Sequence, residues 1–199
     1  MSTMTKAARI CIAAPGREST VKTVSLYLCL TASYLHDIGE LVCKGIDNNK
    51  VKSLELALPT KKSSLECDIA DMVRHAKELV CFFNAFPNLL QCITKLVLHN
   101  ASFSDLEMHY LLNSCEQLQH LELNNCDTGD LSTLKINKPN SKIYYLSLEA
   151  CHFEKVELLC LPKLASLYCE AWISSSAPLL FGHVPSLEEL SLVCSALRY

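Results

Sequence analysis

The chain has 199 residues, of which 50% are hydrophobic and 20% are charged, and its formal net charge is −3. This length fits one ordinary domain, and so many apolar residues can bury a core, which excludes an intrinsically disordered chain. The slightly negative charge gives no general attraction for phosphate backbones, so we expect no nucleic-acid partner.

Twelve cysteines are spread along the chain, but no two of them have the C-x-x-C spacing of zinc or thiol-redox sites. We therefore predict free thiols and no metal. The first twenty residues hold an apolar run only over 10–14, which is too short for a secretory signal. No window approaches the ~18 apolar residues of a membrane helix. These features predict no membrane partner and a cytoplasmic and/or nuclear location.

An L-x-x-L-x-L pattern recurs along the chain. Its seven copies span 21–26, 51–56, 93–98, 118–123, 143–148, 164–169 and 187–192. The last four steps between copies are 25, 25, 21 and 23 residues, within the 20–29 residue period of leucine-rich repeats. Taking the second apolar position of each copy as equivalent aligns Leu54 with Leu96.

These repeats predict an α/β leucine-rich-repeat solenoid. Its curved parallel β-sheet should form the concave face, and helices and irregular returns the convex face. We assign 21–199 to this domain, with about seven irregular repeats and a C-terminus truncated in mid-repeat. Residues 1–20 are predicted to be a poorly ordered N-terminal segment.

The connections between copies carry helix signals in several places. Apolar residues over 34–42 predict a first helix, and a stripe over 65–83 predicts a helical insertion near 63–86, capped by Ser63 or Ser64. Ser104 and Glu107 form a capping box for a third helix, with Leu106, Tyr110 and Leu111 facing inward. The stretch 128–139 is polar, and an irregular return is expected there.

Residues that alternate with the inward apolar positions should point out from the concave face of the sheet. They have no packing role, so this face is where a protein partner is expected to bind. The predicted protein-binding residues are Lys95, His99, His120, Glu122, Asn124, Tyr145, Glu149, Tyr168, Glu170 and Glu189.

Motifs for catalysis are lacking in this sequence, so we predict no enzyme and no cofactor. His120-Leu121-Glu122 matches the H-x-E of zinc deaminases, but the partner motif P-C-x-x-C is absent. Cys126 and Cys151 occupy the same repeat position. We favour a buried thiol ladder bonded to neighbouring backbone over a metal site or a disulfide. Trp172 is expected to be partly buried.

Four segments resemble the repeat region of plant F-box/leucine-rich-repeat proteins, especially those of grasses. They are "ITKLVLHNASFSDLEMHYLLNSCEQLQHLELNNCD" at 93–127, "VKSLELALPT" at 51–60, "LPKLASLYCEAW" at 161–172 and "VPSLEELSLVCS" at 184–195. The resemblance implies a substrate-recognition region of a cullin-RING ubiquitin ligase subunit. In that family an N-terminal F-box binds the ligase adaptor, and the repeats hold the substrate.

About twenty residues precede the first repeat, fewer than an F-box needs. We therefore expect this chain alone not to bind the ligase adaptor. The alternative is a leucine-rich-repeat fragment of an intracellular immune receptor or another interaction scaffold. A nucleotide-binding motif encoded upstream would favour the receptor, and an F-box would favour the ligase subunit.

Overall fold

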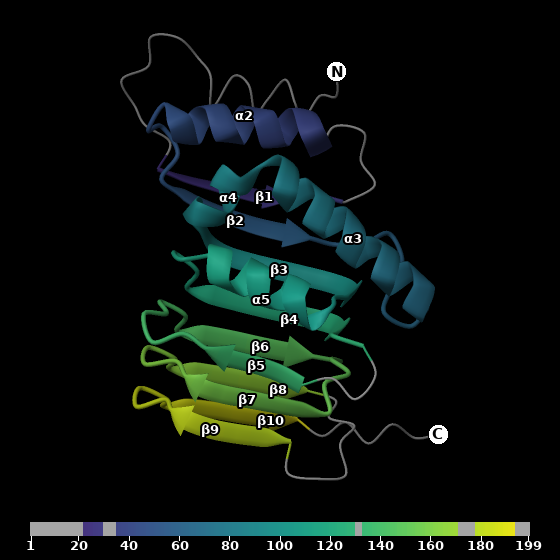
Figure 1. The fold of residues 1–199 in the computed structure, drawn as a ribbon, viewed down its shortest axis with the longest axis vertical. Coiled ribbons are helices and arrows are strands. Elements are labelled where there is room, and N and C mark those ends of the chain that lie inside the picture. The colour runs from purple at the N-terminus through teal and green to yellow at the C-terminus, as the bar shows by residue number, and fades with distance from the viewer. Residues whose placement is uncertain (1–21, 30–34, 130–132, 171–177, 194–199) are drawn as a thin grey trace.

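The computed structural model describes residues 22–29, 35–129, 133–170 and 178–193. A parallel sheet of seven strands runs through it from end to end (Figure 1). In spatial order its strands are β1 (Thr23–Tyr27), β2 (Ser53–Leu58), β3 (Ile93–Ser102), β4 (His120–Asp127), β6 (Tyr145–Glu149), β8 (Ser166–Glu170) and β10 (Glu189–Val193). They fall on the seven copies of the sequence pattern. The predictions for residues 1–20 and for Trp172 lie outside the described residues.

The pattern residues of each strand form the core, as predicted. Leu54, Leu96, Leu121, Leu146 and Leu167 are all 0% exposed. The residues between them point to the opposite face, because successive side chains on a strand alternate. Each inward side chain packs against its equivalents on the adjacent strands and against the elements that cover this face.

The pairing of β2 with β3 differs from the predicted alignment. Leu56, not Leu54, lies opposite Leu96, and Glu55 lies opposite Lys95. The observed pairing thus differs from the predicted alignment by two residues, and a further one-residue irregularity lies between Leu54 and Glu55. Because the side-chain period of a strand is two, the shift leaves the inward residues inward, but it gives each open-face residue of β3 new neighbours.

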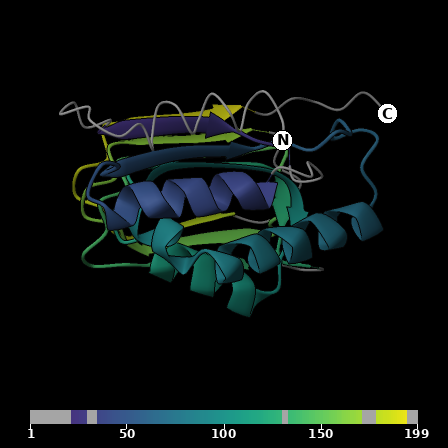
Figure 2. The same cartoon turned by 90° about the horizontal axis from the view of Figure 1, so that it is seen from above.

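Helices cover the N-terminal half of the sheet on its core face (Figures 1 and 2). They are α2 (Leu35–Asp47), α3 (Ile69–Ala85), α4 (Pro87–Cys92) and α5 (Asp105–Ser114). The predicted insertion helix exists as α3, but the cap predicted for it is wrong. Its N-cap is Asp68, whose side chain accepts a hydrogen bond from the Asp71 amide, while Ser63 lies in the preceding turn and bonds to Glu66.

Helix α5 begins as predicted at the Ser104 capping box with Glu107. Its predicted inner face is partly wrong. Leu106 is 82% exposed and Tyr110 43%, whereas Met108, Leu111 and Leu112 are buried. The capping box fixes where the helix begins, but the packing of the solenoid decides which side faces the core.

In the C-terminal half strands replace the helices, and the irregular return expected over 128–139 contains one of them. A three-stranded parallel sheet covers the core here, built from β5 (Thr133–Asn137), β7 (Lys155–Cys160) and β9 (Leu179–His183). Buried Leu134, Ile136, Val156 and Leu158 face the main sheet. Extended segments therefore stack on this half of the main sheet in the place that helices take on the other half.

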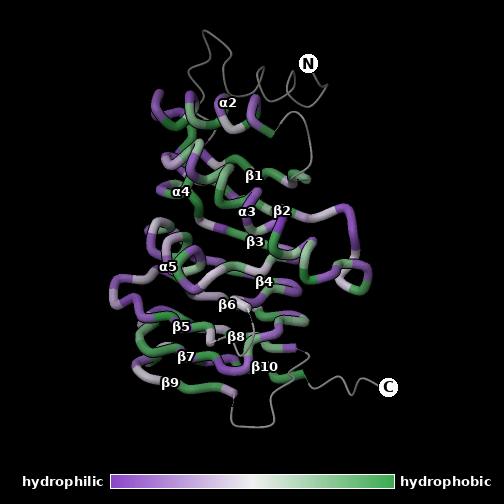
Figure 3. The backbone as a smooth tube through the Cα atoms, turned by 45° about the vertical axis from the view of Figure 1, so that its right-hand side comes forward, coloured by the Kyte–Doolittle hydropathy of each residue, from purple (hydrophilic) through white to green (hydrophobic). Residues whose placement is uncertain are grey.

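The last strands bury much less than their equivalents. Leu190 on β10 is 46% exposed and Leu192 is 59% exposed, although both occupy inward positions of the pattern. Figure 3 shows hydrophobic colour along β10 at this end of the molecule. Within the described residues no later strand packs on β10, so its apolar side chains keep contact with solvent.

Truncating one central leucine tests this stacking. Leu121→Ala removes a fully buried side chain and should lower the free energy of unfolding by roughly 2–5 kcal/mol, since a cavity remains. Domains typically have about 5–15 kcal/mol of stability, so the variant should be protease-sensitive. Urea unfolding measures the change, with exposed Glu149→Ala as the control. Equal stability of both variants would contradict the assigned faces.

Candidate functional site

The ten predicted binding residues all lie on the face of the seven-stranded sheet that points away from the helices and from the second sheet. Among the described residues, no helix or strand covers this open face (Figure 2). The strand register arranges them in three rows across the sheet. These rows are Lys95–His120–Tyr145–Ser166–Glu189, Val97–Glu122–Ser147–Tyr168–Ser191 and His99–Asn124–Glu149–Glu170–Val193.

Four of these residues form a contact cluster on β3, β4 and β6. The Glu122 carboxylate accepts hydrogen bonds from Lys95 Nζ at 2.9 Å and from His120 Nε2 at 2.5 Å. The His120 ring stacks on Tyr145, with centroids 4.2 Å apart and planes 16° apart. Burial raises the pKa of Glu122, but the bonds from Lys95 and His120 outweigh it, so this pKa lies below its ordinary value. The cluster is therefore a preordered, internally paired surface.

A second group lies on β6 and β8, nearer the C-terminal end. The Tyr168 hydroxyl donates to Glu170 at 2.5 Å, and this bond raises the pKa of Tyr168 to about 12. Glu149 is exposed and lies directly beside Glu170 in the register. In the described part of the chain no cationic side chain forms an ion pair with either carboxylate. Among the described residues, this pair therefore carries negative charge that no cation pairs with.

The middle of the open face has polar groups with unmet hydrogen-bonding capacity. The Oδ1 atom of Asn124 is buried and has no hydrogen-bond partner among the described residues. Burial lowers the pKa of its row neighbour His99, although the charge of Glu122 acts in the opposite direction. Glu189 lies on the last strand, β10, and its neighbour in the register is Ser166, which is not one of the ten. The structure thus joins seven of the ten predicted residues into two groups and leaves His99, Asn124 and Glu189 outside them.

The N-terminal strands contribute open-face residues that are not among the ten predicted binding residues. Ser25 Oγ donates to Glu55 at 2.5 Å, and Glu55 lies beside Lys95 across β2 and β3. Tyr27 is 70% exposed. No sequence signal locates the register shift that brings Glu55 into the row of Lys95. Alignment of the repeats alone therefore could not have found this neighbourhood.

Two ladders follow the strands and hold successive repeats together. Cys126 Sγ lies 3.8 Å from the Leu98 carbonyl, and Cys151 Sγ donates to the Leu123 carbonyl at 3.2 Å. The predicted buried thiol ladder is thus confirmed. Beside it, the Asn125 amide donates to Asn100 Oδ1 at 2.7 Å.

The asparagine ladder was missed, although its signal is in the sequence, since each asparagine directly precedes the ladder position of the pattern. Both residues adopt left-handed backbone, with φ of 52° at Asn100 and 50° at Asn125. Asparagine tolerates this conformation better than most residues. Ala150 takes the same conformation in the next repeat, with φ of 50°, but has no amide to extend the ladder.

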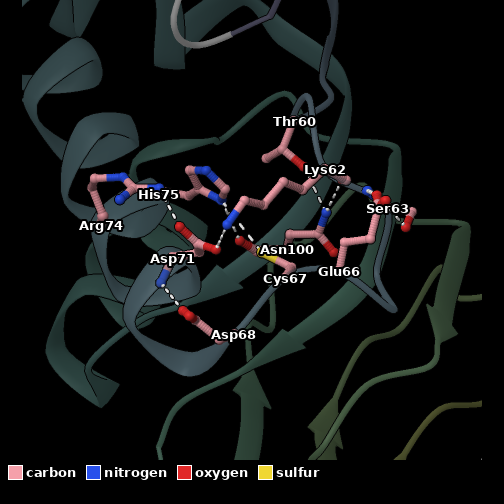
Figure 4. A network of polar contacts seen from close by, with 10 residues as sticks. All are labelled: Thr60, Lys62, Ser63, Glu66, Cys67, Asp68, Asp71, Arg74, His75 and Asn100. Carbon is pink, nitrogen blue, oxygen red and sulfur yellow. Dashed lines mark hydrogen bonds and ion pairs between the residues drawn. The ribbon is translucent and has the colours of Figure 1, made fainter.

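A polar cluster beside α3 is the other concentration of charged groups (Figure 4). Buried Asp71 accepts hydrogen bonds from Lys62 and Arg74. The amide of Asn100 donates to the Lys62 carbonyl at 2.9 Å, and His75 Nδ1 donates to the Asn100 carbonyl at 3.0 Å. Each of these groups is satisfied within the chain. The cluster therefore fixes the loop between β2 and α3 to the asparagine ladder, and we assign it a structural role.

Neither metal binding nor membrane insertion has a visible basis in the described regions. They contain no group of three or more His, Cys, Asp or Glu side chains placed to hold a metal ion. None of the helices there has the length and apolar character required to span a bilayer.

A parallel sheet built from repeated strands, with ladders at the strand ends and helical or extended returns, defines a leucine-rich-repeat protein. The family comparison is more specific. Residues 34–198 match the model for the leucine-rich repeats of FBD-associated F-box protein At5g56370. The chain belongs to this F-box/leucine-rich-repeat family, whose repeats are protein-interaction modules and generally not enzymes. No curated protein and no solved structure matches the chain.

Acid unfolding tests the Asp71 cluster. The hydrogen bond from Lys62, joined by that from Arg74, lowers the pKa of Asp71 to about 2, against ~3.9 in an unfolded chain. The stability from this shift is fully present above pH ~4 and is lost as the pH falls toward 2. Asp71→Asn should be less stable at pH 7 and should lose less stability over this acid range. Melting temperatures at several pH values measure this, and parallel curves for both proteins would contradict it.

Thiol reactivity tests the buried ladder. Burial raises the pKa of Cys126 and Cys169 to about 12, and that of Cys151 well above its ordinary value. These thiols should resist Ellman's reagent in the native protein and react in denaturant. Of the described thiols, exposed Cys81 should react first, and Cys81→Ser should reduce the fast phase by one thiol. Rapid native modification of Cys126 would contradict the assignment.

Proposed function

We propose that the chain is the substrate-recognition region of an F-box/leucine-rich-repeat subunit of a cullin-RING ubiquitin ligase. In this proposal it has no catalytic role and no cofactor, works in the cytoplasm and/or nucleus, and binds a protein substrate on the open face. The family match over residues 34–198 supports the proposal, since it ties the repeats to F-box proteins rather than to immune receptors.

We infer the chemical type of the partner from the acidic pair Glu149 and Glu170, which has no ion-paired cation among the described residues. Tyr168 lies in the next row on β8, and Tyr145 lies two rows from the pair on β6; both offer large contact area at low entropy cost. A basic or hydroxyl-rich segment would supply the cation or the donor that these carboxylates lack, and acidic segments would be repelled. Asn124 Oδ1 offers a further acceptor on the same face.

A paired substitution tests this proposal. Tyr145→Ala with Glu170→Ala removes one aromatic contact and one charge from the open face, while the core leucines stay unchanged. Proximity labelling in plant cells identifies the partner, and calorimetry with the purified proteins measures its affinity. We expect the double variant to bind at least tenfold more weakly. Wild-type affinity should also fall as salt rises, because salt screens exposed charges.

The matched control lies on the other side of the solenoid. His109 is exposed on α5, so His109→Ala should leave the affinity unchanged. Normal binding by the double variant, together with loss of binding in His109→Ala, would contradict binding on the open face. Circular dichroism melting confirms that each variant is folded before its binding is interpreted.

A further inference from the structure

The N-terminal end of the open face has a hollow of about 220 Å³ that neither group described above fills. Ala57 lies between Tyr27 and Val97 in the strand register, so a small side chain separates two larger ones. Glu55 and Lys95 line the same hollow. A depression with an apolar floor and charged flanks thus extends over β1, β2 and β3.

The size and the lining of the hollow favour one type of occupant. Small-molecule pockets usually measure ~300–1,000 Å³, so this space suits a single side chain better than a free ligand. Covering apolar surface gains about 25 cal/mol per Å², which favours an aliphatic or aromatic group. At its flanks, Lys95 pairs with Glu122 at 2.9 Å, and Glu55 accepts a hydrogen bond from Ser25 at 2.5 Å. The apolar floor of the hollow offers no partner for a charged side chain.

The position of the hollow relative to the acidic pair sets the distance between two contacts that one partner segment could make. In the sheet order the pair β2–β3 lies three strand intervals from the pair β6–β8, or ~14 Å at about 4.8 Å per interval. Glu149 and Glu170 lie one row further along the strands than Ala57 and Val97, which adds roughly 7 Å in the perpendicular direction. The straight distance is then ~16 Å, which an extended chain spans in about five residues.

We propose that this hollow binds one aliphatic or aromatic side chain of an extended protein segment, about five residues from a Lys or Arg that pairs with Glu149 and Glu170. The proposal rests on the proposed function, because it uses the acidic pair as the second contact. It adds a specificity determinant: the segment crosses the strands with its apolar residue toward β1 and its basic residue toward β8.

A random dodecapeptide phage library, selected on the immobilised full-length chain, tests the spacing. Enriched peptides should carry an aliphatic or aromatic residue four to six positions from a Lys or Arg. Ala57→Gln places a polar side chain in the hollow, and its selected peptides should keep the basic residue and lose the apolar preference. Thr23→Gln is the matched control, since Thr23 is exposed on β1 but does not line the hollow.

Affinities of one enriched synthetic peptide complete the test. Replacing its apolar residue by Ala should weaken binding to the unchanged protein at least tenfold, a measurement that does not depend on any variant folding. The same replacement should have less than a twofold effect on Ala57→Gln. Peptides with a basic residue but no apolar residue at this spacing would overturn this inference alone. If no enriched peptide lost affinity in the Glu149→Gln/Glu170→Gln double variant, the proposed function would fail as well.

Discussion

The stacking of each repeat on its neighbours is the constraint on which the rest of the structure depends. A single strand with its return exposes one apolar edge on each side, and only the next repeat can cover it. Leu121 and Leu146, with neighbours on both sides, are fully buried, whereas Leu190 and Leu192 remain about half exposed at the last described strand. The same residue type in the same position thus changes from core to surface according to whether a later repeat covers it.

Stacking also explains where polar residues enter the interior. The chain turns at the end of each main strand, and a buried turn needs partners for its backbone groups. His75 provides such a contact to the Asn100 carbonyl, and the Cys151 thiol provides one to the Leu123 carbonyl of the preceding main strand, while the Asn100–Asn125 bond links the side chains of successive repeats. The cluster around Asp71 extends this arrangement to the loop before α3, because Asn100 contacts both the ladder and that loop. Charged groups there hold the scaffold in shape, because their hydrogen bonds are made within the chain.

The open face combines fixed and available groups. Lys95, His120 and Glu122 satisfy one another, so they present a defined shape with little net charge. Glu149 and Glu170 have no cation beside them in the described region, so a partner's charge can contribute there. A surface with one preordered region and one unpaired region can discriminate between partners, because the first limits shape and the second selects charge.

The sequence by itself determined the repeat class, the seven main strands, the inward leucines and the face on which the ten predicted residues lie. These follow from local periodicity, since a strand alternates its side chains whatever its neighbours are. Tertiary structure alone decided which residues become neighbours. The register shift at Leu54 and Glu55, the rotation of α5 that exposes Leu106, and the extended β5 in place of an irregular return all depend on how adjacent repeats fit together. The hollow at Ala57 belongs to this second group, because its walls come from three strands whose pairing no local pattern specifies.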